Sequence, residues 1–224
     1  MIQKPMFSPQ VEWLPPTEFP NLSKYDEIAI DLETKDPDLK TIGSGSVTGR
    51  GQIVGIAVAV QDWSGYYPIA HEGGGNMDKS MVIKWFQDVL NTEATKIFHN
   101  AMYDVCFIRA AGLKINGMIV DTMIAGSLVD ENRFRYDLGS MGRDYIGRGK
   151  NEAVLAETAK EWGIDPKSEM YKLPAMYVGA YAEADAQLTL DLWQEMKKEI
   201  INQDIEDIFK LETELFPCLV DMRF

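Results

Sequence analysis

The stretch Ile28-Ala29-Ile30-Asp31-Leu32-Glu33-Thr34 is an apolar run that ends in two acidic residues separated by a single position. If the run is a strand, Asp31 and Glu33 point to the same side of the sheet, because side chains alternate along a strand with a period of two. Two carboxylates on one face repel each other unless a cation lies between them, and hard divalent ions such as Mg²⁺ take oxygen ligands of this kind. A solvated strand end explains the tripeptide equally well, so a metal site requires further acids at the same place.

A second pair of residues lies where a short expected strand gives way to a helix, at His99-Asn100-Ala101-Met102-Tyr103-Asp104. Asn100 and Asp104 are four positions apart and share a helical face. Asn100 is placed to cap the helix with its side chain, and Asp104 suits the first turn because the helix dipole favours an acid there. Capping alone explains Asn100, and the helix dipole alone explains Asp104.

A third pair, Tyr181 and Asp185, stands at the same four-residue step inside a long expected helix, which puts the hydroxyl and the carboxylate side by side. A packed ring and a surface charge are the ordinary explanation. Together, however, the three pairs offer four carboxylates from one strand and two later helices. If they converge, they predict a site for two divalent ions that cleaves a phosphodiester, with the tyrosine orienting the attacking water.

Around these motifs, the pattern of apolar residues predicts an α/β domain. Strands are expected at residues 27–32, 53–60, 65–69, 96–98 and 118–121, and helices at 78–90, 101–111, 122–129, 137–146, 152–162, 178–200 and 203–220. The first three strands would form an antiparallel meander, and the later strands alternate with helices, which gives a mixed sheet flanked by helices. The segment 35–51, rich in Gly and Ser, is expected to be a mobile loop near the first motif that gates access to it.

The chain of 224 residues fits one large domain with an appendage, and half of its ten prolines lie in residues 1–24. These prolines predict an extended leader that lies on the domain or reaches a neighbour. A net charge of −13 argues against a broad duplex-binding surface, although local basic patches or bound metals would still hold a polyanion. The two cysteines lack disulfide or metal-ligand spacing, and the longest apolar run, 53–60, is too short to span a bilayer. A soluble cytoplasmic protein with no membrane partner is therefore expected, in the host cytoplasm if the source is viral.

Taken in order, the three motifs resemble those of the proofreading 3′-5′ exonuclease domains of family A DNA polymerases. These domains belong to the tyrosine subclass of DEDD exonucleases, in the DnaQ group of the ribonuclease H-like superfamily. The resemblance extends to the segments 67–71, 121–123, 147–151 and 184–190. It implies a ribonuclease H-like exonuclease domain with a mixed five-stranded sheet at residues 25–200, after the leader 1–24 and before a helical segment at 201–224. It also implies hydrolysis of the terminal phosphodiester of DNA, release of nucleoside monophosphates and two divalent ions, Mg²⁺ or Mn²⁺.

The resemblance implies a role for each acid. Asp31, Glu33 and Asp185 would hold the ion nearest the attacking water, and Asp31 would bridge to the second ion. Asp104 would hold that second ion, largely through water, and Tyr181 would position the nucleophile. The histidine subclass is excluded, because the two histidines of the chain, at positions 71 and 99, do not stand at the position of this tyrosine.

Four residues are candidates for contact with the substrate. By the resemblance, Asn100 would lie beside the scissile nucleotide. Leu32 stands between two of the expected ligands, and from this position it would wedge against the terminal base. Arg148 and Lys150 belong to a basic segment, residues 133–150, that would guide phosphates. An ordinary solvated helix surface explains this basic segment equally well.

The last segment, residues 201–224, carries an apolar helical stripe interrupted at Pro217, which is expected to kink or end the helix. It resembles the segment that leads from the exonuclease into the polymerase domain of family A enzymes. The expected partners are therefore DNA 3′ ends, single-stranded or frayed, and a family A polymerase domain. The chain is expected to be either a fragment joined to that domain in cis or a separate exonuclease that docks on it in trans.

Three alternatives remain open from the sequence. A ribonuclease D-like enzyme that trims RNA 3′ ends carries the same motifs, although the polymerase-like tail favours DNA. A catalytically silent docking domain would lack ligands, yet all four acids and Tyr181 are present. A Ca²⁺-stabilised binding domain finds no support, because no spacing typical of an EF-hand occurs.

Overall fold

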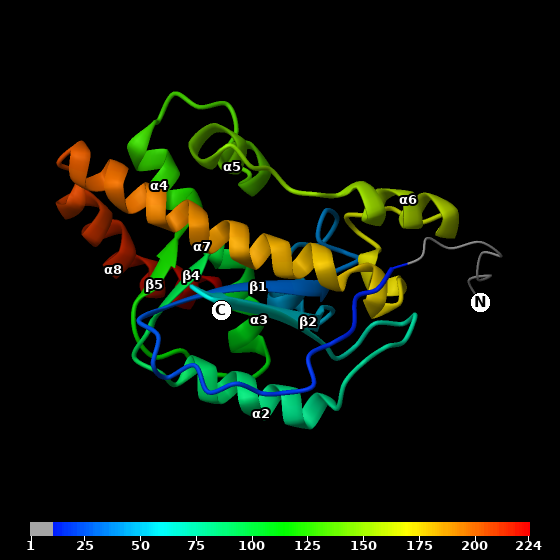
Figure 1. Ribbon diagram of the computed structural model, residues 1–224. Helices are drawn as coiled ribbons and strands as arrows, with labels where there is room; N and C mark the ends of the chain where they lie inside the picture. The colour runs from blue at the N-terminus through cyan, green and yellow to red at the C-terminus, as the bar shows by residue number, and fades with distance from the viewer. Residues whose placement is uncertain (1–10) are drawn as a thin grey trace.

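A five-stranded sheet forms the centre of the computed structural model, which describes residues 11–224 (Figure 1). Its strands are β1 (Glu27–Lys35), β2 (Gln52–Val60), β3 (Trp63–Pro68), β4 (Thr95–Phe98) and β5 (Ile119–Asp121), in the spatial order β3-β2-β1-β4-β5. β1, β2 and β3 are antiparallel neighbours, whereas β4 runs parallel to β1 and β5 parallel to β4. The predicted fold class, an antiparallel meander followed by parallel strands, is confirmed.

Helices cover both faces of the sheet. They are α1 (Gly45–Thr48), α2 (Lys79–Leu90), α3 (Ala101–Ala110), α4 (Thr122–Val129), α5 (Leu138–Ile146), α6 (Ala153–Trp162), α7 (Gly179–Asn202) and α8 (Glu206–Arg223), with two 3₁₀ turns at Met170–Lys172 and Ala175–Tyr177. In Figure 1, the long helix α7 crosses one face, and α2 and α3 lie on the other. None of the helices in the described part of the chain is long and apolar enough to cross a membrane.

The alternation of side chains along β1 divides the core into two layers. Ile28, Ile30 and Leu32 belong to the apolar cluster that contains the buried side chains of α2 and α3. The opposite face carries small residues, and they pack with small residues of α7: Ala29 on β1, Ala57 and Ala59 on β2, and Ala182 and Ala186 on α7. Small side chains on both surfaces let the helix lie close to the sheet, which brings the acid on α7 near those on β1.

The leader runs along the domain from residue 11, and residues 1–10 lie outside the described chain. Trp13 donates from Nε1 to Glu183 Oε1 on α7 at 3.0 Å. Its ring also lies so near Gly179 that a Cβ there would meet Trp13 Cε2 at 2.0 Å. Further along, Phe19 stacks on Tyr67, with ring centroids 5.5 Å apart. The leader is therefore tied to both β3 and the first turns of α7.

Two segments differ from the sequence-based expectation. β1 continues to Lys35, and the expected loop at 35–51 contains α1, because Asp36 accepts a hydrogen bond from the Gly45 backbone N–H at 3.0 Å. Pro217 lies inside α8, so the expectation that the helix ends there is wrong. The neighbouring residues Phe216 and Val220 are buried against the domain, and this packing holds the helix together across the missing N–H.

Candidate active site

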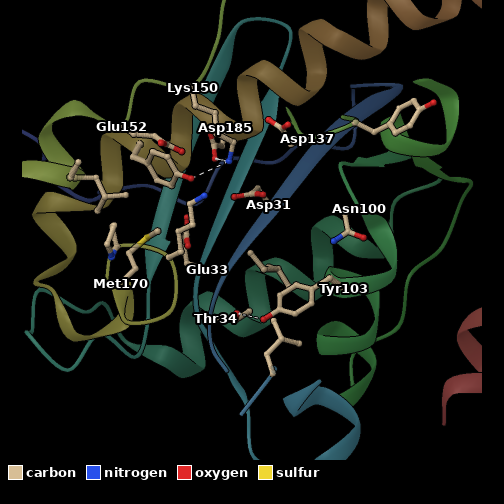
Figure 2. A pocket seen from close by; sticks show the side chains of 18 of the residues that line it. Asp31, Glu33, Thr34, Asn100, Tyr103, Asp137, Lys150, Glu152, Met170 and Asp185 are labelled. Atoms are coloured by element: carbon tan, nitrogen blue, oxygen red, sulfur yellow. Dashed lines mark hydrogen bonds and ion pairs between the residues drawn. The ribbon is translucent and has the colours of Figure 1, made fainter. Parts of the chain in front are cut away.

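A cavity of about 820 Å³ opens beside the second half of β1 (Figure 2). β1 contributes four consecutive residues, Asp31 to Thr34, and α7 contributes Tyr181 and Asp185. The start of α3 adds Asn100 and Tyr103, and the segment between α5 and α7 adds Lys150, Glu152, Leu155, Ala156, Pro166, Lys167 and Met170. The structure therefore brings together three of the four predicted acids and the predicted tyrosine.

The carboxylates of Asp31 and Glu33 have no hydrogen-bond donor among residues 11–224. Both point from β1 toward the face covered by α7, as the predicted alternation requires. Burial and the nearby Asp185 raise the pKa of Asp31 to about 7, although Lys150 offsets part of the effect. Burial, together with repulsion from Asp31 and Asp185, raises the pKa of Glu33 well above its usual value. These acids are held in a place where a cation would stabilise their ionised forms.

Lys150 provides the nearest positive charge. Its ammonium group donates to Asp185 Oδ2 and, at 3.0 Å, to the hydroxyl oxygen of Tyr181 (Figure 2). Burial alone would lower the pKa of Lys150, but attraction to Asp185, Asp31 and Glu33 outweighs burial and raises it. Burial and the neighbouring carboxylates also raise the pKa of Tyr181, so its hydroxyl keeps its proton.

Asp104, the fourth predicted acid, lies behind the cavity wall. It is buried, and its Oδ1 accepts the backbone N–H of Leu32 at 3.1 Å. Burial and repulsion from Asp31 raise the pKa of Asp104 well above its usual value. The structure therefore places this acid within one hydrogen bond of β1, yet it is not among the residues that line the cavity.

Asn100 occupies the predicted N-cap position of α3, but its side chain makes no capping hydrogen bond. Its backbone is left-handed, with φ 65° and ψ 51°, which Asn tolerates better than most residues. Asp121 takes the capping role instead, because its carboxylate accepts the N–H groups of Asn100 at 2.9 Å and Ala101 at 2.8 Å. The expectation of side-chain capping by Asn100 is wrong, and its amide is left to face the cavity.

The opposite wall of the cavity is fixed by a short hydrogen-bond chain. The hydroxyl of Tyr103 lies 2.8 Å from Thr34 Oγ1 and donates to Asp36 Oδ2 at 3.1 Å. Asp36 in turn accepts the N–H of Gly45, so this chain connects β1, α3 and the segment that contains α1. Leu39 lines the cavity from that segment, and none of the residues of α1 does so.

The four residues predicted to contact the substrate do not all lie in the cavity. Lys150 and Asn100 line the cavity, and Leu32 reaches it although its side chain is buried in the core. Arg148 is ion-paired with Asp191 on α7 and does not line the cavity. Of the basic residues in segment 133–150, Arg135 shares the cavity wall with Lys150.

Sequence reasoning missed part of this wall. Lys167 and Met170 line the cavity, but no helical or strand pattern was expected for residues 163–177. Glu152 also lines it, and its place at the start of an expected helix gave no sign of this. Asp121 was recognisable in principle, since an Asp that directly precedes a helix is a common N-cap, and it also accepts the N–H of Met123 at 2.9 Å.

The donor set fits a divalent ion by its chemistry. Asp31, Glu33 and Asp185 offer hard oxygen ligands on one wall, and the first two have no hydrogen-bond donor within residues 11–224. Within residues 11–224, however, no three acidic, His or Cys side chains are already arranged around a common point as ligands. Lys150 bonds to Asp185 in this arrangement, so side chains must move before the acids can share an ion.

Comparison with known proteins gives consistent results. A family model described as 3′-5′ exonuclease matches residues 18–201. A DNA-directed DNA polymerase of Pseudomonas phage M6 is 35% identical in an alignment that covers 99% of this chain and 35% of that protein. DNA polymerase I of Chloroflexus aurantiacus is 26% identical, over 76% of this chain and 18% of its own. The chain thus spans about a third or less of the length of these relatives.

Two solved structures share the fold. Brucella melitensis NrnC with bound Mg²⁺ superposes with a TM-score of 0.63 at 17% identity, covering 91% of this chain and 88% of its own. Escherichia coli RNase D, an exoribonuclease, superposes with a TM-score of 0.57 at 18% identity, covering 90% of this chain and 45% of its own. At this level of identity, the two structures support the architecture of the sheet and its helices.

Proposed function

The chain belongs to the 3′-5′ exonuclease family found in DNA polymerases, and from this membership we propose that its cavity removes nucleotides from DNA 3′ ends. The reaction is hydrolysis of the terminal phosphodiester with release of a nucleoside monophosphate. The observation that carries the proposal is the convergence of Asp31, Glu33 and Asp185 beside the hydroxyl of Tyr181. These three buried carboxylates repel one another and accept few hydrogen bonds from the described residues, so their convergence does not stabilise the fold.

Divalent metal ions are used across this family, and one neighbour in fold holds Mg²⁺. We assign two ions, Mg²⁺ or Mn²⁺, to this chain. Asp31, Glu33 and Asp185 would hold one ion, Asp31 would bridge to the second, and Asp104 would reach the second ion largely through water. When bound, such ions supply an activated water and offset the charge that develops on the phosphate.

The other residues of the wall orient the reactants. Tyr181 keeps its proton, so its hydroxyl can donate to one partner while accepting from another, which suits a group that aligns a water. The amide of Asn100 faces the place where the terminal nucleotide would lie, and Leu32 reaches the edge of that place while its side chain stays in the core. Lys150 and Arg135 offer the positive charge for its phosphate, whereas Arg148 is paired outside the cavity.

The polymerase relatives support DNA as the substrate and proofreading as the context. We propose a family A polymerase domain as partner, in cis or in trans. α8 supports this assignment, because it leaves Ile208, Leu211 and Leu215 exposed on one side. The phage relatives favour the host cytoplasm as the place of action.

The proposal is tested with a DNA primer labelled at its 5′ end and annealed to leave a mismatched 3′ terminus. Stepwise shortening with Mg²⁺ or Mn²⁺, its absence with EDTA, and its loss in Asp31→Ala are expected. A matched RNA serves as the second substrate. Trimming of RNA without any shortening of DNA would move the chain to a ribonuclease D-like function, and inactivity on both, also after addition of the polymerase domain, would indicate a silent docking domain.

A further inference from the structure

Lys150 makes its two hydrogen bonds to the very groups that the proposed reaction needs. Asp185 must be available as a metal ligand and Tyr181 as the residue that orients the water. In the structure, the ammonium of Lys150 bonds to both, and its side chain is about one-quarter exposed while that of Asp185 is almost fully buried. A buried ion pair of this kind does not arise from random contact at a surface, because both partners have given up solvent for it.

Acidic side chains from two elements surround this ammonium, while Gly139 of α5 packs near its stem. β1 contributes Asp31 and Glu33, and α7 contributes Asp185 with Tyr181 beside it. Glu152, two residues further along the chain, lines the same cavity. Among the cavity residues within the described chain, Arg135 and Lys167 are also cationic, but neither forms an ion pair with an acid of this group.

The ammonium of Lys150 carries one positive charge near the carboxylates of Asp31, Glu33 and Asp185, where a divalent cation would otherwise neutralise them. It lowers their mutual repulsion and leaves a net negative charge that still attracts an ion. The pair with Lys150 occupies Oδ2 of Asp185, and no three acids in the described chain are arranged around a common ligand point. The four-carbon stem of lysine allows the ammonium to leave without a change in the backbone.

We propose that Lys150 is an internal counter-ion that holds the metal-free site together and has to leave Asp185 and Tyr181 before a divalent ion can bind. The inference rests on the proposed two-metal site. It makes Lys150 a residue that sets the metal affinity of the site. A divalent ion must displace the ammonium as well as lose water, and this weakens the binding of ions in the absence of substrate. A residue that only contacts phosphate would have no such effect on metal affinity in the absence of nucleic acid.

The test measures Mn²⁺ binding by calorimetry and by electron paramagnetic resonance, without DNA, at about pH 8.5 so that protons do not compete for the carboxylates. Lys150→Met is the main variant. We expect it to bind Mn²⁺ at least roughly tenfold more tightly than the wild type, because a like charge a few ångströms from the ion is removed. Lys167→Met is the matched control, since it removes a charge from the same cavity wall without breaking an ion pair, and its affinity should stay within about twofold.

The second measurement is the melting temperature in EDTA. Lys150→Met should melt several degrees below the wild type, since the loss of one partner leaves buried carboxylates unpaired, and saturating Mn²⁺ should remove most of this difference. Lys150→Gln, which keeps a hydrogen-bond donor, takes the place of the Met variant if circular dichroism shows that the latter does not fold.

Unchanged or weaker Mn²⁺ binding by Lys150→Met would overturn the inference while leaving the exonuclease proposal intact. Equal tightening in Lys167→Met would also overturn it, because a general effect of charge would then suffice. If neither the wild type nor Lys150→Met binds Mn²⁺, the proposed metal site itself fails and the inference fails with it.

Discussion

The two ends of β1 both carry acidic residues, and the molecule treats them in opposite ways. Glu27, at the start of the strand, accepts hydrogen bonds from Trp193 Nε1 and Gln194 Nε2, each at 2.9 Å, and from Lys197 Nζ at 2.7 Å. Burial alone would raise the pKa of Glu27, but these three donors outweigh it and lower the pKa. Asp31 and Glu33, four and six positions later, receive no donor within the described residues, and their pKa values rise.

The same helix faces both ends, so proximity to α7 does not explain the difference. Near Glu27, α7 presents two amine or amide donors and an indole N–H. Near Asp31, it presents another carboxylate, Asp185, and a tyrosine. A carboxylate that accepts several hydrogen bonds stabilises the fold, whereas a buried carboxylate without donors is a candidate for binding a ligand. The supply of donors therefore separates structural from reactive carboxylates on one strand.

The largest effect is expected from the reactive end. Asp31→Ala should lower the rate of DNA 3′-end hydrolysis by at least about a thousandfold, because it removes a ligand proposed to bridge two ions. In EDTA, its melting temperature should equal or slightly exceed that of the wild type, since one of several mutually repelling acids is gone. The rate is measured on the mismatched primer and stability by thermal unfolding. A drop of several degrees without metal would show that Asp31 is a structural acid like Glu27.

Tyr181→Phe should have an intermediate effect. Loss of the hydroxyl should lower kcat by roughly ten- to a hundredfold, as is usual for a group that positions a reactant by one hydrogen bond. Mn²⁺ affinity should change little, because the acids remain in place. Steady-state kinetics and calorimetry on one preparation separate the two effects. An unchanged kcat would remove Tyr181 from the reaction.

The structural end should respond in the opposite sense. Glu27→Ala leaves three donors without their shared acceptor, which should lower the free energy of unfolding by about 2 kcal/mol. Activity per folded molecule should stay within about twofold of the wild type, because Glu27 lies away from the cavity. Urea unfolding measures the first quantity and the primer assay the second. A thousandfold loss of activity would contradict the division of the strand into two functions.

A further expected effect concerns the pH dependence of stability in the metal-free protein. The pKa of Asp31 is raised to about 7 from an ordinary value of 3.8, so the folded state binds its proton more tightly than the unfolded state does. As pH rises from about 5 to 8, the wild type should therefore lose about 2 to 3 kcal/mol of stability relative to Asp31→Asn, because each pH unit below the raised pKa contributes about 1.4 kcal/mol. Urea unfolding in EDTA at several pH values measures this difference. Comparison with the variant cancels His71 and His99, whose pKa values of about 4 act in the other direction.

Glu27 provides the control for this pH series. Because its pKa is lowered, its contribution to stability is present above the ordinary value of 4.5 and is lost as pH falls further. The difference between wild type and Glu27→Gln should hence be flat between about pH 5 and 8. A flat profile for Asp31→Asn as well would show that the two ends of β1 titrate alike.

Much of the fold was predictable because its signals are local. The alternation of β1 and the apolar stripe of α2 reflect which face each element buries, and short-range periodicity records that directly. The convergence of Asp31, Glu33 and Asp185 was predictable from the order of the motifs, once they were considered together. The partners of these acids were not predictable in the same way. Nothing local distinguishes Lys150, which bonds to Asp185, from Arg148, which pairs with Asp191.

The two predictions that were wrong, side-chain capping by Asn100 and a helix end at Pro217, have the same cause. In both places, residues distant in sequence decide the local structure. Asn100 has the sequence of an N-cap, but Asp121 from the end of β5 satisfies the N–H groups instead. Pro217 signals the end of a helix, but burial of its neighbours against α3 and β5 residues keeps α8 continuous. In both places, tertiary contacts outweigh a local preference worth only about 1 to 3 kcal/mol.

The contact between Trp13 and Glu183 joins positions 170 residues apart. During synthesis, the indole leaves the ribosome long before the helix that receives it, so it stays without its partner until α7 has emerged. Contacts of such long sequence separation form late, because a large loop has to close first. Docking of the partly buried Trp13 on α7 is therefore a late step in the folding of the domain.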